Sequence, residues 1–436
     1  MIIQNDVYKI LVQVILEKGH CNVLLAQMMR DKNLTLSEKE AIEKIVLGTL
    51  KNQIYLDYIL NQIWNVLKSV ITIPFHITIL LWIVLYEIYF LEITNKEIFI
   101  ENTLKKVSTI DNKLTFIISK VLDLCFTEFR SEFNLQKESK QNIKLIKYSY
   151  PSWLYSLIKS QFSINIANQL IKDNLRMPLI SFRVNTLKTT VNKVLNNENY
   201  KSFNFCLSEI VSDGIISSKS IFNTKLYENG EIIKQDQASM LVSHILDPQP
   251  YDEVLDMCAG IASKTAHMAA LMSNHGKIVA CDINEERLKI GATYLKKLGV
   301  TNTELKYGDS TILDFNNKFD KILIDAPSTA WGLIKRKPEV KLINWSKEEI
   351  NQLITVQAKL LNKAYQLLKP EAIVVYVTCT FNIKENQNQI DNFVKNHPDM
   401  TIITEKQFFV FNNNTDGFYI CKLKKEYRGT VYENKC

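Results

Sequence analysis

The chain has 436 residues, of which 46% are hydrophobic and 23% charged, which excludes a disordered or fibrous chain and allows two or three domains. The net charge of +7 permits an anionic partner such as RNA without requiring one. The eight cysteines form no CxxC pair and the six histidines no HExxH motif, so no metal site is expected and a reducing, cytoplasmic location is favoured.

Residues 1–134 are predicted to be helical, because hydrophobic residues recur at helical spacing and no strand alternation interrupts them. Ser37 and Glu40 have the spacing of a capping box, which predicts the start of a helix. The hydrophobic face of the first helix is expected to consist of Val7, Ile10, Leu11, Val14 and Ile15.

The most hydrophobic stretch, residues 71–93, approaches the length of a membrane span. Pro74 and His76 lie near its start, and Glu87 and Glu92 interrupt its end. These residues favour a buried core helix over a span. The first residues of the chain also lack the basic region of a secretory signal, so no membrane association is expected.

The polar, lysine-rich stretch 135–150 is typical of a linker or an exposed connection. A new helical segment follows it, with the sequence YPSWLYSLIKSQF. Residues 179–188, LISFRVNTLK, are predicted to contain a strand, and weaker strand patterns continue to about residue 233.

From residue 238 onward, strands and helices alternate, which predicts a parallel sheet covered by helices on both faces. Ser346 and Glu349 form a second capping box, before a long helix that runs to Leu368. A final helix and a terminal strand follow the fifth strand. The strands are expected within 253–259, 277–283, 303–309, 321–327, 372–379 and 417–425.

Acids and thiols follow the predicted parallel strands, at the sheet edge where such folds bind ligands. Taken singly, each of these residues is equally compatible with packing or with capping the next helix. Asp282, at the end of the second strand, has the position of the acid that accepts ribose hydroxyls in nucleotide-binding folds. The residues at this edge are Asp256, Cys258, Asp282, Asp309, Asp325 and Cys379.

These residues belong to an ordered series of motifs: QDQAS, DMCAGIASKT, CDINEERL, YGDS, DAPSTAWGLIKRKPEVK, YVTCTFNIKENQ and DGFYICKL. The series resembles that of the bacterial RNA cytosine-5 methyltransferases, and most closely the 16S rRNA (cytosine-5)-methyltransferase B family. The resemblance covers nearly the whole chain and is strongest over residues 235–390.

The resemblance implies an α/β class I methyltransferase domain, Rossmann-like and dependent on S-adenosylmethionine, at residues 236–430. It also implies three preceding parts. These are an all-α NusB-like RNA-binding domain at 1–134, a linker at 135–165 and a small α/β RNA-binding subdomain at 166–235.

The activity implied is methyl transfer to C5 of a cytosine in RNA, most closely 16S ribosomal RNA. Cytosine C5 is a poor nucleophile until a thiolate adds to C6, so the reaction needs an accessible cysteine. The resemblance assigns the nucleophile to Cys379 and the contact to the base to Asp325. The alternatives are a buried structural thiol and a helix cap.

The same resemblance implies that Asp282 holds the cofactor ribose, that Asp309 lies near the adenine, and that Asp325 borders the methyl donor. The loop around the methionine part is expected to contain Cys258, Ala259, Gly260, Ile261, Ala262, Ser263 and Lys264.

The expected partner is single-stranded or loop RNA, because the target base must be unstacked, and the chain is expected to act as a monomer. The run Lys335, Arg336 and Lys337 is equally compatible with phosphate binding and with a solvated surface. Arg183 and Asn185 are candidates for contacts with the substrate strand.

Two positions depart from the family pattern. The loop CAAPGGKT of the family is CAGIASKT here, so Ala262 and Ser263 replace two glycines, which puts cofactor affinity in question. Ser328 replaces a cysteine that in the family helps to release the methylated RNA. The alternative function is therefore an RNA-binding protein of the same fold with weakened cofactor binding and impaired catalysis.

Overall fold

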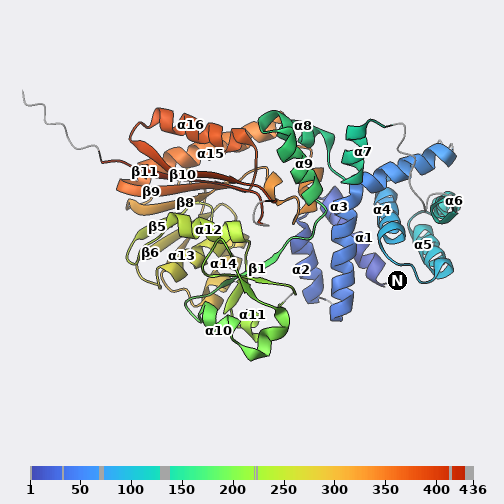
Figure 1. The fold of residues 1–436 in the computed structure, drawn as a ribbon, viewed down its shortest axis with the longest axis horizontal. Helices are drawn as coiled ribbons and strands as arrows, with labels where there is room; N and C mark the ends of the chain where they lie inside the picture. Colours follow the sequence, from blue (N-terminus) through green and yellow to red (C-terminus); the bar gives the residue numbers. More distant parts are fainter. Residues whose placement is uncertain are drawn as a thin grey trace, which may run out of the picture. The chain divides into compact units, whose positions relative to one another are not determined.

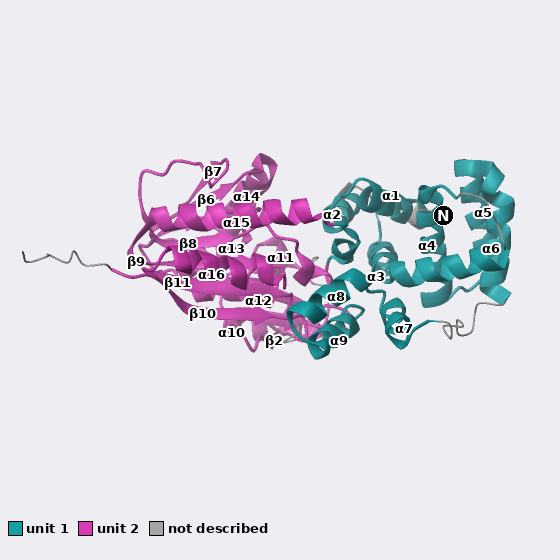
Figure 2. Cartoon of the chain, turned by 90° about the horizontal axis from the view of Figure 1, so that it is seen from above, with its two compact units in different colours: residues 1–176, 337–344 teal, residues 177–336, 345–436 magenta. Residues whose placement is uncertain are grey.

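The computed structural model describes residues 2–31, 34–67, 73–127, 138–219, 221, 224–411 and 415–427. The chain forms two compact units, which Figure 2 shows in separate colours. Unit 1 is Met1–Arg176 with Lys337–Asn344, and unit 2 is Met177–Arg336 with Trp345–Cys436. The four-part division expected from the sequence stays a prediction. Parts of it lie outside the described residues, namely 1, 32–33, 68–72, 128–137, 220, 222–223, 412–414 and 428–430.

The N-terminal part of unit 1 is built of helices joined by short loops, with no strand among its described residues, as the hydrophobic periodicity predicts. Val7, Ile10, Leu11 and Val14 are buried in its core, and Ile15 packs partly buried against it. The elements are α1 (Ile2–Leu16), α2 (Cys21–Asp31), α3 (Leu36–Leu67), α4 (Phe75–Phe90), α5 (Lys96–Asp111), η1 (Asn112–Leu114) and α6 (Thr115–Thr127).

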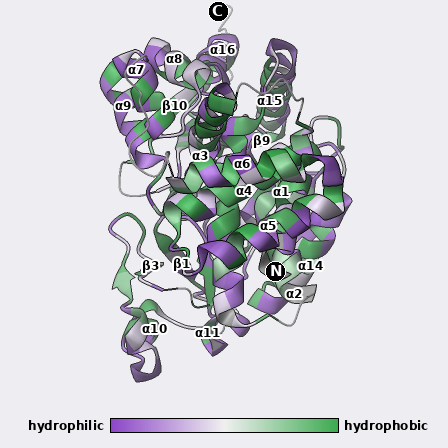
Figure 3. Ribbon diagram, turned by 90° about the vertical axis from the view of Figure 1, so that its right-hand side faces the viewer, coloured by the Kyte–Doolittle hydropathy of each residue, from purple (hydrophilic) through white to green (hydrophobic). Residues whose placement is uncertain are grey.

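Helix α4 is the hydrophobic stretch that the sequence predicts to be a core helix, and this prediction is confirmed. Its residues Ile77 and Ile79–Tyr86 are buried among the other helices of unit 1. Figure 3 shows hydrophobic residues concentrated on α1 and α4. Among the helices that the structure describes, none is both long enough and apolar enough to cross a membrane.

The capping box predicted at Ser37 and Glu40 is wrong by two residues. The backbone N–H of Thr35 donates to the carboxylate of Glu38 (2.8 Å), and the N–H of Glu38 donates to the Thr35 hydroxyl (3.3 Å). Both pairs have the same spacing in the sequence, and only the folded backbone shows which residue precedes the first helical turn.

Helices also occupy most of the segment expected to be a linker. These are α7 (Lys140–Lys147) and α8 (Ser152–Gln161), which precede α9 (Ile164–Asp173). Leu145, Tyr150 and Leu154 are buried, so this segment packs against unit 1 rather than extending into solvent. The lysine-rich sequence conceals these buried positions, because they are few and widely spaced.

Unit 2 begins with a small antiparallel sheet of order β2-β3-β1-β4. Phe182 and Val184 of β1 and Ile215 of β3 form its buried core. Its elements are β1 (Ile180–Val184), α10 (Val191–Leu195), η3 (Glu198–Phe203), β2 (Cys206–Leu207), β3 (Gly214–Ser217), α11 (Lys225–Glu228) and β4 (Ile232–Lys234).

A seven-stranded sheet of order β10-β11-β9-β8-β5-β6-β7 forms the centre of unit 2. The strands β9, β8, β5, β6 and β7 are parallel, as predicted, and β10 and β11 are antiparallel additions at one edge. The strands are β5 (Glu253–Asp256), β6 (Lys277–Asp282), β7 (Thr303–Tyr307), β8 (Phe319–Asp325), β9 (Leu368–Thr378), β10 (Met400–Phe408) and β11 (Phe418–Lys425). The sequence analysis missed β10, an edge strand with several exposed residues.

Helices cover both faces of this sheet (Figure 1). Alternate strand residues divide between the faces, so that Leu255 and Ile322 meet α15 and α16 while Val254 and Leu323 meet α12 and α13. The capping box of Ser346 and Glu349 is confirmed at the start of α15. The remaining elements are α12 (Gln237–Leu246), α13 (Ser263–Leu271), α14 (Glu285–Leu298), η4 (Trp331–Leu333), η5 (Pro338–Leu342), α15 (Lys347–Leu367), η6 (Ile383–Glu385) and α16 (Gln387–Asn396).

Candidate active site

Four neighbouring parallel strands end in chemically reactive residues. Asp282, Asp256 and Asp325 are the last residues of β6, β5 and β8, and Cys379 directly follows β9. Because the strands are adjacent and parallel, these side chains belong to a single edge of the sheet. The structure therefore brings together the acids and the thiol that the strand pattern predicts.

Cys379 is half-buried, whereas Cys281 and Cys421 of the same sheet are buried. Its Sγ lies 3.4 Å from the hydroxyl oxygen of Ser328, in the loop that follows β8. The carbonyl oxygen of Cys379 accepts a hydrogen bond from the N–H of Gly332 (3.0 Å). Cys379 is therefore only partly buried where it packs against the core, and a hydrogen bond holds its backbone.

Gly332 is required by this close packing. A Cβ at this position would come within 2.0 Å of the carbonyl oxygen of Gly417 and within 2.8 Å of that of Cys379. Since real Cβ atoms do not approach backbone so closely, only glycine fits here.

Lys264, in the first turn of α13, forms an ion pair of 2.5 Å with Asp325. Burial alone would lower the pKa of Lys264, but the charge and hydrogen bond of Asp325 outweigh it and raise the pKa above its usual value. Side-chain exposure is 10% for Lys264 and 29% for Asp325, so the acid is the more accessible partner. The lysine holds Asp325 at the edge of the site.

Asp256 is buried near this pair, and one of its oxygens accepts a hydrogen bond from the Thr265 hydroxyl (2.8 Å). Burial raises the pKa of this carboxyl to about 7, with a further contribution from the charge of Asp325. Asp256 therefore changes its charge close to neutral pH.

The loop between β5 and α13 is tied to β6. The carboxylate of Asp282 accepts hydrogen bonds from the N–H groups of Gly260 (2.7 Å) and Asn284 (2.8 Å). The N–H of Ala259 donates to the carbonyl oxygen of Cys281 (2.8 Å). Cys258 is half-buried in this loop, and Ile261 points its side chain outward with 45% exposure.

The residues of this edge fit the expected cofactor. A Cβ at Gly260 would meet no atom within 4 Å, so space is open beside the loop. Asp282 is an acid of the type that nucleotide-binding folds place near ribose hydroxyls, and Lys264 is a cation near the loop. Asp309 follows β7, where its side chain accepts from the N–H and hydroxyl of Thr311 (2.9 and 2.8 Å).

Of the two residues that replace family glycines in this loop, Ala262 has the strained backbone. Its φ of +63° lies in the left-handed region that favours glycine, so the family glycine at this position has a conformational reason. Ser263 begins α13, where the backbone is helical and a glycine is not required. The departure from the family pattern therefore strains one of the two replaced positions.

Arg183 and Asn185, expected to contact RNA, are buried within unit 2. The Nε of Arg183 donates to Gln235 (2.8 Å), and the amide of Asn185 donates to the carbonyl oxygens of Gly230 and Leu298 (both 2.9 Å). These bonds give both side chains a structural role. Their contact with RNA stays a prediction.

The basic run after β8 is not a uniform surface. Lys335 is buried, and Arg336 pairs with Asp236 (3.1 Å) and Asp416 (3.0 Å). Lys337 is half-buried and already belongs to unit 1. Phosphate binding by these three residues likewise stays a prediction.

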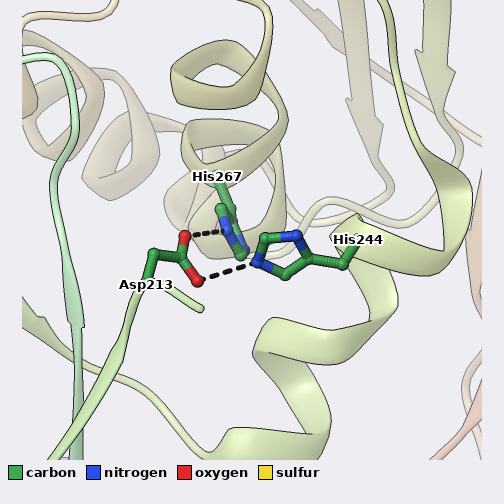
Figure 4. A group of neighbouring side chains, drawn as sticks. All are labelled: Asp213, His244 and His267. Carbon is green, nitrogen blue, oxygen red and sulfur yellow. Dashed lines mark hydrogen bonds and ion pairs between the residues drawn. The ribbon is translucent and has the colours of Figure 1, made fainter. Parts of the chain in front are cut away.

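A second polar cluster lies in unit 2, where Asp213 bridges two histidines (Figure 4). Its carboxylate oxygens lie 2.8 Å from Nε2 of His244 on α12 and 2.7 Å from Nε2 of His267 on α13. Two imidazoles and a carboxylate are ligands that suit a divalent transition metal. However, burial and the nearby charge of Arg183 lower the pKa of His267 to about 4, and the same charge disfavours a bound cation. We interpret the cluster as structural: its hydrogen bonds attach the turn before β3 to α12 and α13.

The sequence analysis missed Glu385, Gln357 and Gly332, which contact the loops that carry Ser328 and Cys379. The one feature of the sequence that could have indicated Glu385 is its place within the motif YVTCTFNIKENQ. Nothing in the sequence shows that its carboxylate is buried.

Comparison with solved structures identifies the class of protein. A methyltransferase homolog protein from Pyrococcus horikoshii is 30% identical over 66% of this chain and 99% of that chain, with a TM-score of 0.59. Together with the Rossmann-like parallel sheet and the acids at its carboxyl edge, this similarity defines a methyltransferase of the S-adenosylmethionine-dependent class.

Comparison with known families is more specific. The family model for the 16S rRNA methyltransferase RsmB/F matches residues 243–424, and that for the ferredoxin-like domain of RsmF/B-like methyltransferases matches residues 150–221. A Bacillus subtilis (strain 168) protein named probable ribosomal RNA small subunit methyltransferase B is 28% identical over 94% of this chain and 95% of its own length. The chain belongs to the RsmB/F methyltransferase family.

A further relative is the Mus musculus 28S rRNA (cytosine-C(5))-methyltransferase, which is 30% identical over 312 residues. The match covers 64% of this chain but only 39% of the mouse protein. The similarity is therefore confined to part of that longer protein.

Proposed function

We propose that this protein transfers a methyl group from S-adenosylmethionine to C5 of a cytosine in RNA, through a covalent bond between Cys379 and C6. The observation that carries the proposal is the half-buried Cys379 beside Asp325, at the carboxyl edge of the sheet. The family membership and the names of the relatives support a ribosomal RNA substrate, and the description of the family model supports 16S rRNA in particular. The name of the mouse relative supports C5 of cytosine as the target atom.

In the proposed mechanism, the thiolate of Cys379 adds to C6 and makes C5 electron-rich. Asp325 hydrogen-bonds the base at N3 or N4 and steadies it as charge develops. The cofactor supplies the electrophilic methyl group when it is bound. After C5 is methylated, loss of its proton and expulsion of the Cys379 thiolate restore the aromatic ring.

We further propose roles for the residues around the cofactor. Asp282 holds the ribose, Asp309 lies near the adenine, and the loop from Cys258 to Lys264 surrounds the methionine part. Support comes from the open space at Gly260 and from the hydrogen bonds that fix this loop against Asp282. The proposed partner is a single-stranded or looped rRNA segment, bound by a monomer in the cytoplasm.

A second candidate function is an RNA-binding protein with impaired catalysis. The strained backbone at Ala262 favours it, because this residue lies in the proposed cofactor loop. Titration calorimetry with S-adenosylmethionine separates the two functions. Measurable binding supports the enzyme, and its absence supports the binding protein.

The test of the proposed activity is transfer of labelled methyl groups from S-adenosylmethionine to 16S rRNA. We expect the wild type to label cytosine C5 and Cys379→Ala to lose at least about 10³-fold of the rate, as expected when a covalent nucleophile is removed. Cys206→Ala, at an exposed thiol on β2, is the matched control and should retain activity. Equal activity of Cys379→Ala and wild type would rule out the covalent mechanism.

A further inference from the structure

Glu385 is a buried carboxylate in the segment that follows Cys379, with 0% of its surface exposed. It ends the short helix η6. Its Oε1 accepts hydrogen bonds from the Thr329 hydroxyl (2.7 Å) and the Asn382 amide (2.9 Å). Its Oε2 accepts from the N–H of Thr329 (2.9 Å) and from the Gln357 amide (3.1 Å).

These bonds join the two loops that carry the reactive side chains. Thr329 is the neighbour of Ser328, and Thr380 is the neighbour of Cys379. The hydroxyl oxygens of Thr329 and Thr380 lie 2.9 Å apart. The network is therefore attached one residue beyond Ser328 and one residue beyond Cys379.

Further bonds extend the network along both loops. The Gln357 amide that donates to Glu385 also donates to the carbonyl oxygen of Pro327 (2.9 Å), directly before Ser328. The Asn386 amide donates to the carbonyl oxygen of Thr380 (3.0 Å). The backbone is thus held on both sides of Ser328 and after Cys379.

The charge of Glu385 is matched by donors rather than by a cation. All four groups that contact it are neutral, and within the described part of the chain it has no ion-pair partner. A carboxylate offers only acceptors, so it satisfies two donors at each oxygen. A glutamine of the same size would place an NH₂ group against two donors, which leaves buried N–H groups unsatisfied.

We propose that Glu385 is a positioning residue: it holds the loops of Ser328 and Cys379 so that the two side chains keep the relative positions that the methyl-transfer reaction requires. The proposal rests on the proposed role of Cys379. Glu385 acts through the loops and makes no contact with the reacting atoms.

The first test compares Glu385→Gln in the full chain with wild type and with Glu348→Gln, at an exposed carboxyl on α15. We expect Glu385→Gln to lower kcat for methyl transfer by at least about tenfold, because small misplacement of reacting groups is costly. The KM values for RNA and S-adenosylmethionine should stay within about twofold, since the cofactor loop is elsewhere. Glu348→Gln should match wild type.

The second readout is the rate of alkylation of Cys379 by iodoacetamide across pH, measured by mass spectrometry of its peptide. Loosening the loops changes the surroundings of the thiol, so the pH profile of Glu385→Gln should shift, whereas a merely structural role would leave it unchanged. This readout requires no methyl transfer. If wild type transfers no methyl group, the proposed function fails while the alkylation profile still tests Glu385.

A second pair of variants tests the same network if Glu385→Gln does not fold. Thr329→Val removes the hydroxyl but keeps the shape and the backbone N–H, and Thr329→Ser restores the hydroxyl. We expect Thr329→Val to lower kcat and shift the alkylation profile, and Thr329→Ser to resemble wild type. An unchanged kcat and an unchanged alkylation profile in Glu385→Gln, or in Thr329→Val, would overturn the proposal.

Discussion

At the scale of single residues, the site depends on which groups stand beside Cys379 and Asp325. Ser328 lies 3.4 Å from the sulfur, at the position where the family carries a second cysteine. Lys264 pairs with Asp325, and burial raises the pKa of the nearby Asp256 to about 7. Two predictions follow from these neighbours, one on the lifetime of the covalent adduct and one on stability against pH.

Ser328→Cys is expected to shorten the lifetime of the proposed adduct between Cys379 and RNA. A thiol ionises near pH 8.5 and a serine hydroxyl far above it, so cysteine is the better group for proton transfer during release. The measurement is the decay of the protein–RNA band on a denaturing gel. Ser310→Cys, at a buried hydroxyl after β7, is the control. An unchanged lifetime in Ser328→Cys would contradict a role of residue 328 in release.

Asp256 is expected to make stability depend on pH. Its pKa is about 7 in the folded chain and about 3.9 in an unfolded one, so between these values the folded state binds the extra proton. The stability from the protonated carboxyl is present below pH about 4 and is lost as the pH rises through about 7. The thermal midpoint of wild type should therefore fall relative to Asp256→Asn between pH 5 and 8, by several degrees.

Asp314→Asn, at an exposed carboxyl, controls for the chemical change alone. A pH-independent difference between wild type and Asp256→Asn would show that Asp256 keeps one charge state over this range.

At the scale of elements, helix starts show what a sequence pattern can and cannot determine. Two capping boxes are predicted, and the one at Ser346 and Glu349 is confirmed at the start of α15. At the start of α3, four hydroxyl or acid residues lie within six positions, and the true capping box is Thr35 with Glu38. The choice depends on where the backbone enters the helix.

Thr35→Ala is expected to cost about 1 kcal/mol of stability in unit 1, because it removes the acceptor for a free N–H in the first turn. Ser37→Ala should change stability by no more than a few tenths of a kcal/mol, since Ser37 already lies within α3. Thermal unfolding of both variants checks the assignment. A larger loss of stability in Ser37→Ala than in Thr35→Ala would instead support the capping box predicted at Ser37 and Glu40.

At the scale of the whole molecule, the chain does not divide at a single point. It leaves unit 2 after Arg336, contributes Lys337–Asn344 to unit 1, and returns to unit 2 at Trp345. Within unit 1 the buried Lys341 donates to the carbonyl oxygens of Lys51 (2.5 Å) and Ser149 (2.7 Å). Burial lowers the pKa of Lys341 to about 7. This segment is therefore an integral part of the helical unit.

Lys341→Met is expected to destabilise unit 1 by about 1–3 kcal/mol, because two buried carbonyl oxygens lose their donor while the volume stays similar. The measurement is hydrogen exchange of the α3 amides near Lys51, which should lose protection. Lys337→Met, in the same segment but only half-buried, is the control. Unchanged protection in Lys341→Met would show that the segment does not support the helical unit.

Much of the fold and of the site could be predicted because it depends on periodic patterns and on residue type. Continuous hydrophobic runs identified β5, β6, β8 and β9. The polar and charged residues near the ends of the stretch 71–93 favoured a core helix over a span. The acids and the cysteine at the strand ends followed from the parallel topology, since such ends share one edge.

The sequence by itself determined the parallel sheet, the helical N-terminal region and the identity of the strand-end residues, because local periodicity and chain order carry that information. Only the tertiary structure decided which partners these residues have. It paired Lys264 with Asp325, buried Arg183, Lys335 and Glu385, placed Ala262 at φ +63° and assigned Lys337–Asn344 to unit 1. These outcomes depend on contacts between segments far apart in the chain, which no local pattern encodes.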